Sequence, residues 1–146
     1  MEVSRAASVQ PVAPLYRAFV IITAAALGCT LLAGLAVFQA MLVAGRPWGR
    51  FAWGGQHTVL PTGLRIGSVV SIALYALFAV IILATAQRAA HGTGAGMAGI
   101  GIWLLTAYFA LGIPLNAASR SRPERLVMTP VVVLLAAVCL VLALQP

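Results

Sequence analysis

The residues best suited to specific chemistry lie in one polar and aromatic stretch, residues 45–65, which reads GRPWGRFAWGGQHTVLPTGLR. Arginine guanidinium groups match the geometry of phosphate, and tryptophan rings favour the headgroup region of a membrane. The stretch carries both types, at Arg46, Trp48, Arg50, Trp53 and Arg65. The pattern therefore indicates a specific site for an anionic lipid headgroup or a partner helix, or else an aromatic belt with arginines that extend to the membrane surface.

His57 is the residue of this stretch most open to a catalytic interpretation. Thr58 beside it could act as a nucleophile, but adjacent residues seldom face each other, and the stretch holds no carboxylate to orient the imidazole. A solvated histidine or a pH sensor is the remaining interpretation. The other histidine, His91, falls in the next loop, on the opposite side of the membrane, so the two cannot share a haem or a metal ion. We therefore expect no enzyme activity, no cofactor and no metal.

A second group of arginines lies in residues 117–126, which read AASRSRPERL. These arginines are Arg120, Arg122 and Arg125. Ser121 followed three residues later by Glu124 is a capping-box pattern, and it predicts that a helix begins here. If this segment and residues 45–65 are the third and first loops of a four-span protein, they lie on the same side, and we expect their arginines to form one surface.

The composition places this surface in a membrane protein. Of the 146 residues, 62% are hydrophobic and 8% charged, and the mean hydropathy is +1.06, values outside the range of soluble domains. The net charge of +7 comes from arginine alone, at the ends of apolar runs. This placement favours phosphate headgroups over nucleic acid as the binding partner. Arginine without lysine, together with abundant Ala, Gly, Val and Leu, indicates a bacterial source.

Uncharged apolar runs predict four transmembrane helices, at residues 18–44, 66–86, 97–116 and 127–144. Short or moderate loops join them, which predicts an all-α fold, a polytopic transmembrane antiparallel four-helix bundle. We expect residues 17–146 to form this single domain and residues 1–16 to form a flexible tail. In the first loop, Pro47 can open a short interfacial amphipathic helix. Small residues at every fourth position predict close helix contacts, at Ala26, Thr30 and Gly34 and at Gly63, Gly67 and Ser71.

The predicted spans offer little chemistry for coupled transport. None contains Asp, Glu, Lys, Arg or His, which argues against ion or proton coupling. Cys29 and Cys139 are far apart in sequence and form no C-x-x-C pair for thiol chemistry. The third span carries polar side chains near Pro114, where we expect the helix to kink or end. A polar path for a small-molecule or lipid carrier would use Thr106, Tyr108 and Asn116.

The arginine distribution predicts the orientation in the membrane. The side with the first and third loops has six arginines, whereas the side with both termini and the second loop has three. The positive-inside rule therefore places the first and third loops in the cytoplasm and both termini outside.

Three segments resemble a group of small four-span membrane proteins from bacteria, particularly actinobacteria. They read PWGRFAWGGQH at 47–57, LPTGLR at 60–65 and NAASRSRPER at 116–125. The likeness covers most of the chain from the first span onward. It implies the four-span fold and a location in the bacterial plasma membrane, and it assigns no catalytic residue.

Our leading functional hypothesis is a non-enzymatic accessory or interaction module whose loop face contacts membrane lipids, a partner membrane protein or a second copy of the chain. The alternative is a small-molecule or lipid carrier, and a membrane-embedded enzyme comes third. We expect no nucleic acid as a partner.

Overall fold

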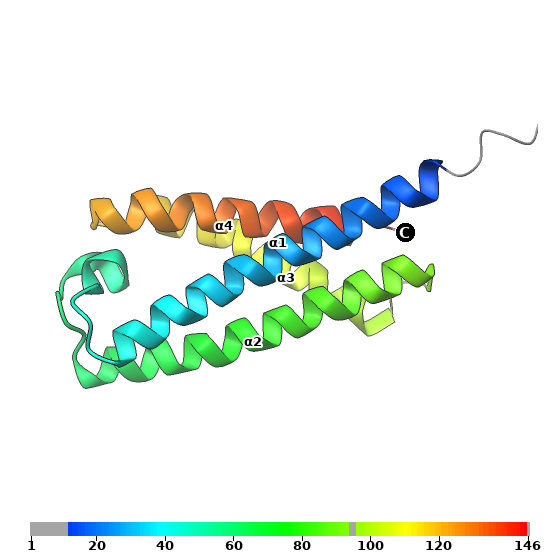
Figure 1. Cartoon of the computed structure of the whole chain (residues 1–146). Coiled ribbons are helices and arrows are strands. Elements are labelled where there is room, and N and C mark those ends of the chain that lie inside the picture. The colour runs from blue at the N-terminus through cyan, green and yellow to red at the C-terminus, as the bar shows by residue number, and fades with distance from the viewer. Residues whose placement is uncertain (1–11, 94–95, 146) are drawn as a thin grey trace, which may run out of the picture.

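Four long helices form the protein, and the computed structural model describes residues 12–93 and 96–145. The helices are α1 (Val12–Val43), α2 (Thr62–His91), α3 (Gly96–Ala117) and α4 (Arg122–Ala143), and they run antiparallel (Figure 1). Two short 3-10 turns, η1 (Gly49–Phe51) and η2 (Trp53–Gly55), lie in the first loop. Each of the four long helices is long and apolar enough to cross a membrane. The predicted all-α four-helix fold is confirmed.

The first two helices extend beyond their predicted bounds. α1 begins at Val12, so residues 12–16, which the sequence assigned to a tail, are helical, while residues 1–11 of that tail lie outside the described residues. Arg17 helps to fix this end, because its Nη2 donates to the Ala89 carbonyl at 3.4 Å. α2 runs until Gly92, whose φ of 65° is the left-handed conformation that ends helices and favours glycine.

The last two helices lie close to their predicted positions. α3 runs from Gly96 to Ala117, within one residue of the predicted span at each end, and it does not end at Pro114. A proline in the last turn removes only one backbone hydrogen bond, so the helix can continue past it. α4 begins where the capping box predicts, because Ser121 is the N-cap and its hydroxyl accepts from the Glu124 amide at 3.5 Å.

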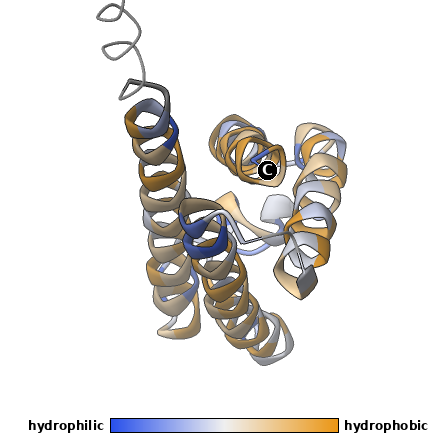
Figure 2. Cartoon of the chain, turned by 90° about the vertical axis from the view of Figure 1, so that its right-hand side faces the viewer, coloured by the Kyte–Doolittle hydropathy of each residue, from blue (hydrophilic) through white to orange (hydrophobic). Residues whose placement is uncertain are grey.

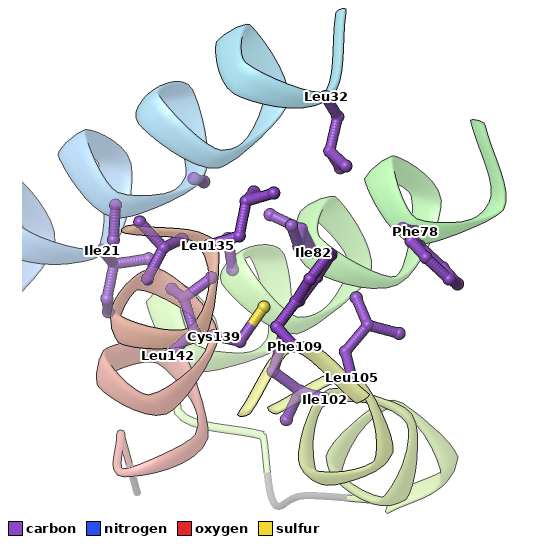
Figure 3. Close-up of a cluster of buried hydrophobic side chains, with 14 of the residues drawn as sticks. Ile21, Leu32, Phe78, Ile82, Ile102, Leu105, Phe109, Leu135, Cys139 and Leu142 are labelled. Carbon is purple, nitrogen blue, oxygen red and sulfur yellow. The ribbon is translucent and has the colours of Figure 1, made fainter. Parts of the chain in front are cut away.

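The common core of the four helices lies in the half of the bundle that carries the end of α4. The most deeply buried side chains there come from all four helices and point into one space (Figure 3). They include Ile21, Ile82, Ile102, Leu135 and Cys139. Gly28 lets α1 approach closely, since a Cβ on it would lie 3.0 Å from Val138 Cγ1 and 3.2 Å from Ile82 Cδ1. Both cysteines are free thiols.

The first predicted small-residue face does not carry a close helix contact. No neighbouring atom lies within 4 Å of the place that a Cβ would take on Gly34, and Ala26 and Thr30 are exposed. On the second face Gly63 is also open, whereas Gly67 is covered by a side chain of the first loop. The spacing of small residues does not tell which side of a helix faces its neighbours.

The four helices form two pairs. α1 packs mainly on α2, and α3 packs mainly on α4. Figure 2 looks along the bundle from the end of α4. A second cluster of Leu42, Ala52 and Leu60 joins the first loop to α1 and α2. The two helix pairs leave space between them in the half of the bundle near the first and third loops, and that space forms the cavities described below.

The outer surface of the helices is largely apolar. In the most apolar 18-residue window of each helix, only 17% to 28% of the residues are buried within the chain, and the ribbons in Figure 2 are mostly coloured as hydrophobic. Leu83, Leu104 and Leu111 are examples of large side chains that face outward. So much exposed apolar surface is suited to lipid, so the chain has the architecture of a multi-pass membrane protein.

Candidate functional site

The first loop is a folded unit. The expected amphipathic helix takes the form of the turns η1 and η2, with Ala52 extended between them at φ −147° and ψ 162°. The Gly49 amide donates to the Thr58 carbonyl at 3.0 Å, which closes the loop on itself. Gly54 has φ 77°, a conformation that glycine adopts without strain. The loop therefore holds its polar and aromatic side chains in fixed positions.

Trp53 anchors this loop to α2. Its backbone has φ 56°, an uncommon value for a residue other than glycine. The indole covers Gly67, where a Cβ would lie 2.7 Å from the ring atom Cη2, and Nε1 donates to the hydroxyl of the fully buried Ser68 at 3.4 Å. Sequence reasoning assigned Trp53 to the wall of a headgroup site, but the structure uses its ring to fasten the loop.

The first and third loops are joined by the carboxylate of Glu124. Its Oε2 accepts from the Gly54 amide at 2.9 Å and from the Ser119 hydroxyl at 2.6 Å. A capping-box Glu would reach back to the amide of Ser121, but here that amide donates to the Ser119 hydroxyl at 3.2 Å, which leaves the carboxylate for the first loop. The Ser121 hydroxyl adds a second link by donating to the Arg50 carbonyl. The two loops therefore form one surface, as their shared side of the bundle implied.

We call residues 45–65 and 117–125 together the loop platform. The hydrogen bond from the Ser121 hydroxyl to the Arg50 carbonyl brings the backbone of Arg50 next to the segment that carries Arg120 and Arg122, and all three arginines are exposed. Glu124 is the only side-chain carboxylate in the described residues, and its Oε2 accepts from Gly54 and Ser119. The six arginines of the two loops outnumber this one carboxylate, so the platform carries a net positive charge.

The other predicted residues of the platform take different places. Arg65 is structural, because its Nε donates to the Leu60 carbonyl at 2.8 Å and its guanidinium lies against Gly45. Three further predicted residues are exposed on the same loops and take no part in the hydrogen bond between Arg50 and Ser121. They are Arg46, Arg125 and His57. The sequence pattern placed Arg65 in one group with the exposed arginines, because residue type and spacing do not show whether an arginine has a structural role.

An apolar space of about 380 Å³, the lateral groove, lies beneath the platform between α1 and α4. Its lining comes from α1, η1 and α4 and comprises Thr30, Leu31, Gly34, Leu35, Phe38, Trp48, Phe51, Val127, Met128 and Val131. The rings of Phe38 and Trp48 stack, with centroids 6.3 Å apart and an interplanar angle of 9°. The Arg50 guanidinium carbon lies 4.8 Å from the centroid of the Phe51 ring. The positive charge of Arg50 therefore lies against one of the aromatic rings that line the groove.

Comparison with protein-family models, with curated proteins and with solved structures finds no match to this chain. The geometry of its own residues is therefore the basis for any statement about function.

A second space of about 380 Å³, the interhelical cavity, lies between the two helix pairs. It is lined by Tyr108 and Asn116 of the predicted polar path, while Thr106 is not among its lining residues and donates to the Ile102 carbonyl at 2.8 Å. The nearby Gln39 is only 7% exposed, and its Oε1 has no hydrogen-bond partner. The cavity therefore contains two of the three residues of the predicted polar path.

The described residues offer no evident metal centre. Across residues 12–93 and 96–145, no group of three His, Cys, Asp or Glu side chains comes together. What the described residues provide is a hydrogen-bonded loop platform with exposed arginines, next to an apolar groove.

Proposed function

We propose that this chain is a non-enzymatic membrane module that binds the headgroups of anionic phospholipids on its loop platform. The observation that carries this proposal is the hydrogen bond between the two loops, from Ser121 to the Arg50 carbonyl, which joins the segments that carry the exposed Arg50, Arg120 and Arg122. Guanidinium groups bind phosphate oxygens in pairs of parallel hydrogen bonds, and clusters of them recognise phosphorylated ligands. The lack of charged residues in the predicted spans, which argues against ion or proton coupling, agrees with such a role.

The platform supports this function because it is held in place before any ligand arrives. Trp53 fastens it to α2, Arg65 fastens it to Leu60, and Glu124 joins its two loops. A preorganised site loses less conformational entropy on binding than a flexible loop does. The platform also lies at the ends of four apolar helices, which is where lipid phosphates lie in a bilayer.

The arginine cluster can be tested with two charge-matched double variants. Arg50→Gln with Arg122→Gln removes two charges beside the Ser121 link, and Arg46→Gln with Arg125→Gln removes two exposed charges elsewhere on the platform. At about 1 kcal/mol for each arginine, the first variant should lose roughly thirtyfold of the preference for phosphatidylglycerol over phosphatidylcholine. The control variant should keep most of it.

Native mass spectrometry of the purified full chain with mixed lipids measures this preference. Equal lipid retention by the wild type and the Arg50 and Arg122 variant would contradict the proposal. So would a wild-type protein that shows no preference for the anionic lipid.

The proposal includes an orientation, with the platform on the cytoplasmic side of the bacterial plasma membrane. Six of the nine arginines belong to the first and third loops, and the cytoplasmic leaflet carries anionic lipid. A phosphatase reporter fused after Pro146 should then be active outside the cytoplasm, and a fluorescent protein fused at the same place should stay dark if it is exported unfolded. An inactive phosphatase fusion together with a fluorescent fusion that emits light would place the residues after Pro146 in the cytoplasm, and the orientation would then be reversed.

A carrier for a small apolar molecule is the second candidate, and the interhelical cavity with Tyr108 and Asn116 favours it. The same mass spectra separate the two functions. A co-purified molecule that survives in the Arg50 and Arg122 double variant would support the carrier, because it would occupy a site independent of the platform charges.

A further inference from the structure

We infer that the lateral groove holds one acyl chain of the anionic phospholipid whose phosphate the platform binds. The inference rests on the proposed function and extends it from a headgroup surface to a site for a whole lipid. It is carried by the position of the groove, by the chemistry of its lining and by the charge of Arg50 against the lining residue Phe51.

The groove has the depth of a lipid tail. It extends along α1 from Phe38, near the platform, to Thr30. Nine helical positions correspond to about 12 Å at 1.5 Å per residue. One leaflet contributes about half of a hydrocarbon core that is about 30 Å thick. A chain that entered beneath the platform would therefore lie in the groove for most of its own leaflet.

The lining suits an aliphatic chain and not a polar ligand. Thr30 carries the only hydroxyl in the groove, and that hydroxyl donates to the Ala26 carbonyl of its own helix at 2.8 Å. The other walls are aliphatic or aromatic side chains and Gly34. No neighbouring atom lies within 4 Å of the position of a Cβ on Gly34, so the groove stays open at this point because the residue has no side chain.

The two parts of the site meet at η1. Phe51 lines the groove, and the guanidinium of the preceding Arg50 lies 4.8 Å from its ring centroid. Arg120 and Arg122 flank Ser121, which donates to the Arg50 carbonyl. A lipid with its phosphate on these arginines would therefore have its glycerol backbone at Phe51, where the groove begins. This complementarity of charge and apolar surface selects an anionic phospholipid over a neutral apolar molecule or a partner helix.

Two variants of α1 test the groove in the full-length protein. Gly34→Phe places a ring in the groove. Ala33→Phe is the matched control, since Ala33 is also exposed on α1, next to Gly34, and does not line the groove. Native mass spectrometry with phosphatidylglycerol should show roughly tenfold or greater loss of bound lipid for Gly34→Phe and no loss for Ala33→Phe. Glycerol phosphate, which has no tail, should bind both variants equally.

Quenching of tryptophan fluorescence gives an independent measurement in a chain whose groove is not blocked. Phosphatidylglycerol with brominated acyl chains should quench a part of the tryptophan fluorescence that disappears in Trp48→Phe, because Trp48 lines the groove. Brominated phosphatidylcholine at the same mole fraction should quench this part much less.

The outcomes separate the groove from the platform. Unchanged lipid binding in Gly34→Phe, with the preference still lost in the Arg50 and Arg122 variant, overturns the acyl-chain site and leaves the headgroup surface in place. Equal loss of both lipids in Gly34→Phe, with no preference in the wild type, overturns the anionic lipid and the proposed function together. A lipid-free dimer would show that a second copy covers the groove, and would also overturn the inference.

Discussion

Replacing Glu124 with alanine is expected to separate the two loops of the platform and to lower the free energy of unfolding by about 2 kcal/mol. The carboxylate accepts from the Gly54 amide at 2.9 Å and from the Ser119 hydroxyl at 2.6 Å, in a half-buried position. Hydrogen bonds to a charged group contribute about 1.5 to 3 kcal/mol each when shielded from water. Because this group is partly exposed, we expect less than the sum of two such bonds.

Thermal unfolding of the full chain in one detergent, together with hydrogen exchange of the Gly54 amide, measures this effect. Glu124→Gln is the matched control, since its amide oxygen can still accept from Gly54, and it should lose less stability than the alanine variant. Ser119→Ala removes one of the two donors and should fall between the wild type and Glu124→Ala. An unchanged exchange rate at Gly54 in Glu124→Ala would show that the carboxylate does not hold the loops together.

Loss of the hydrogen bonds of Glu124 should also weaken lipid binding at the loop platform. Arg50 is positioned by the Ser121 hydroxyl, and Ser121 is the N-cap of the helix turn that carries Glu124. If the third loop moves away, Arg120 and Arg122 no longer lie beside Arg50. Glu124→Ala should therefore weaken the preference for anionic lipid although it makes the platform more positive, a result that a simple count of charges would not predict.

The features that the sequence predicted correctly are those set by local patterns. The four spans follow from the length of the apolar runs, and the start of α4 follows from Ser121 and Glu124 three residues apart. The joint surface of the two loops follows from the up-and-down order of the helices. None of these predictions requires knowledge of how one side chain meets another across the fold.

The features that could not be predicted from the sequence depend on contacts between distant segments. Glu124 and Gly54 are 70 residues apart, and nothing in either segment specifies the other as its partner. Trp53 adopts a backbone conformation against its own preference, because its ring is held by α2. Local propensity cannot anticipate a conformation that tertiary contacts impose.

One error could have been avoided from the sequence. At 3.6 residues per turn, Thr106 and Tyr108 are about 200° apart around α3 and cannot face the same space. Tyr108, Gly112 and Asn116 are spaced by four, and all three line the interhelical cavity. The helical period thus favoured two of the three residues of the polar path and excluded the third.

Gly49→Ala is expected to disrupt the first loop through a direct clash with the backbone of that loop. A Cβ on Gly49 would overlap the His57 carbonyl oxygen and would lie 2.7 Å from Leu60 Cδ1. The carbonyl cannot move aside easily, because the neighbouring Thr58 carbonyl accepts from the Gly49 amide at 3.0 Å. Overpacking against backbone at such a site costs about 3 kcal/mol.

Gly54→Ala separates this steric effect from a conformational one. Gly54 has φ 77° and no atom within 4 Å of its Cβ position, so alanine there meets only the cost of a left-handed backbone, about 1 to 2 kcal/mol. Limited proteolysis within residues 45–65 and thermal unfolding should both rank Gly49→Ala as the less stable variant. The reverse order would mean that the loop is not closed between Gly49 and Thr58, and the arginines would then lack the fixed base that lipid recognition requires.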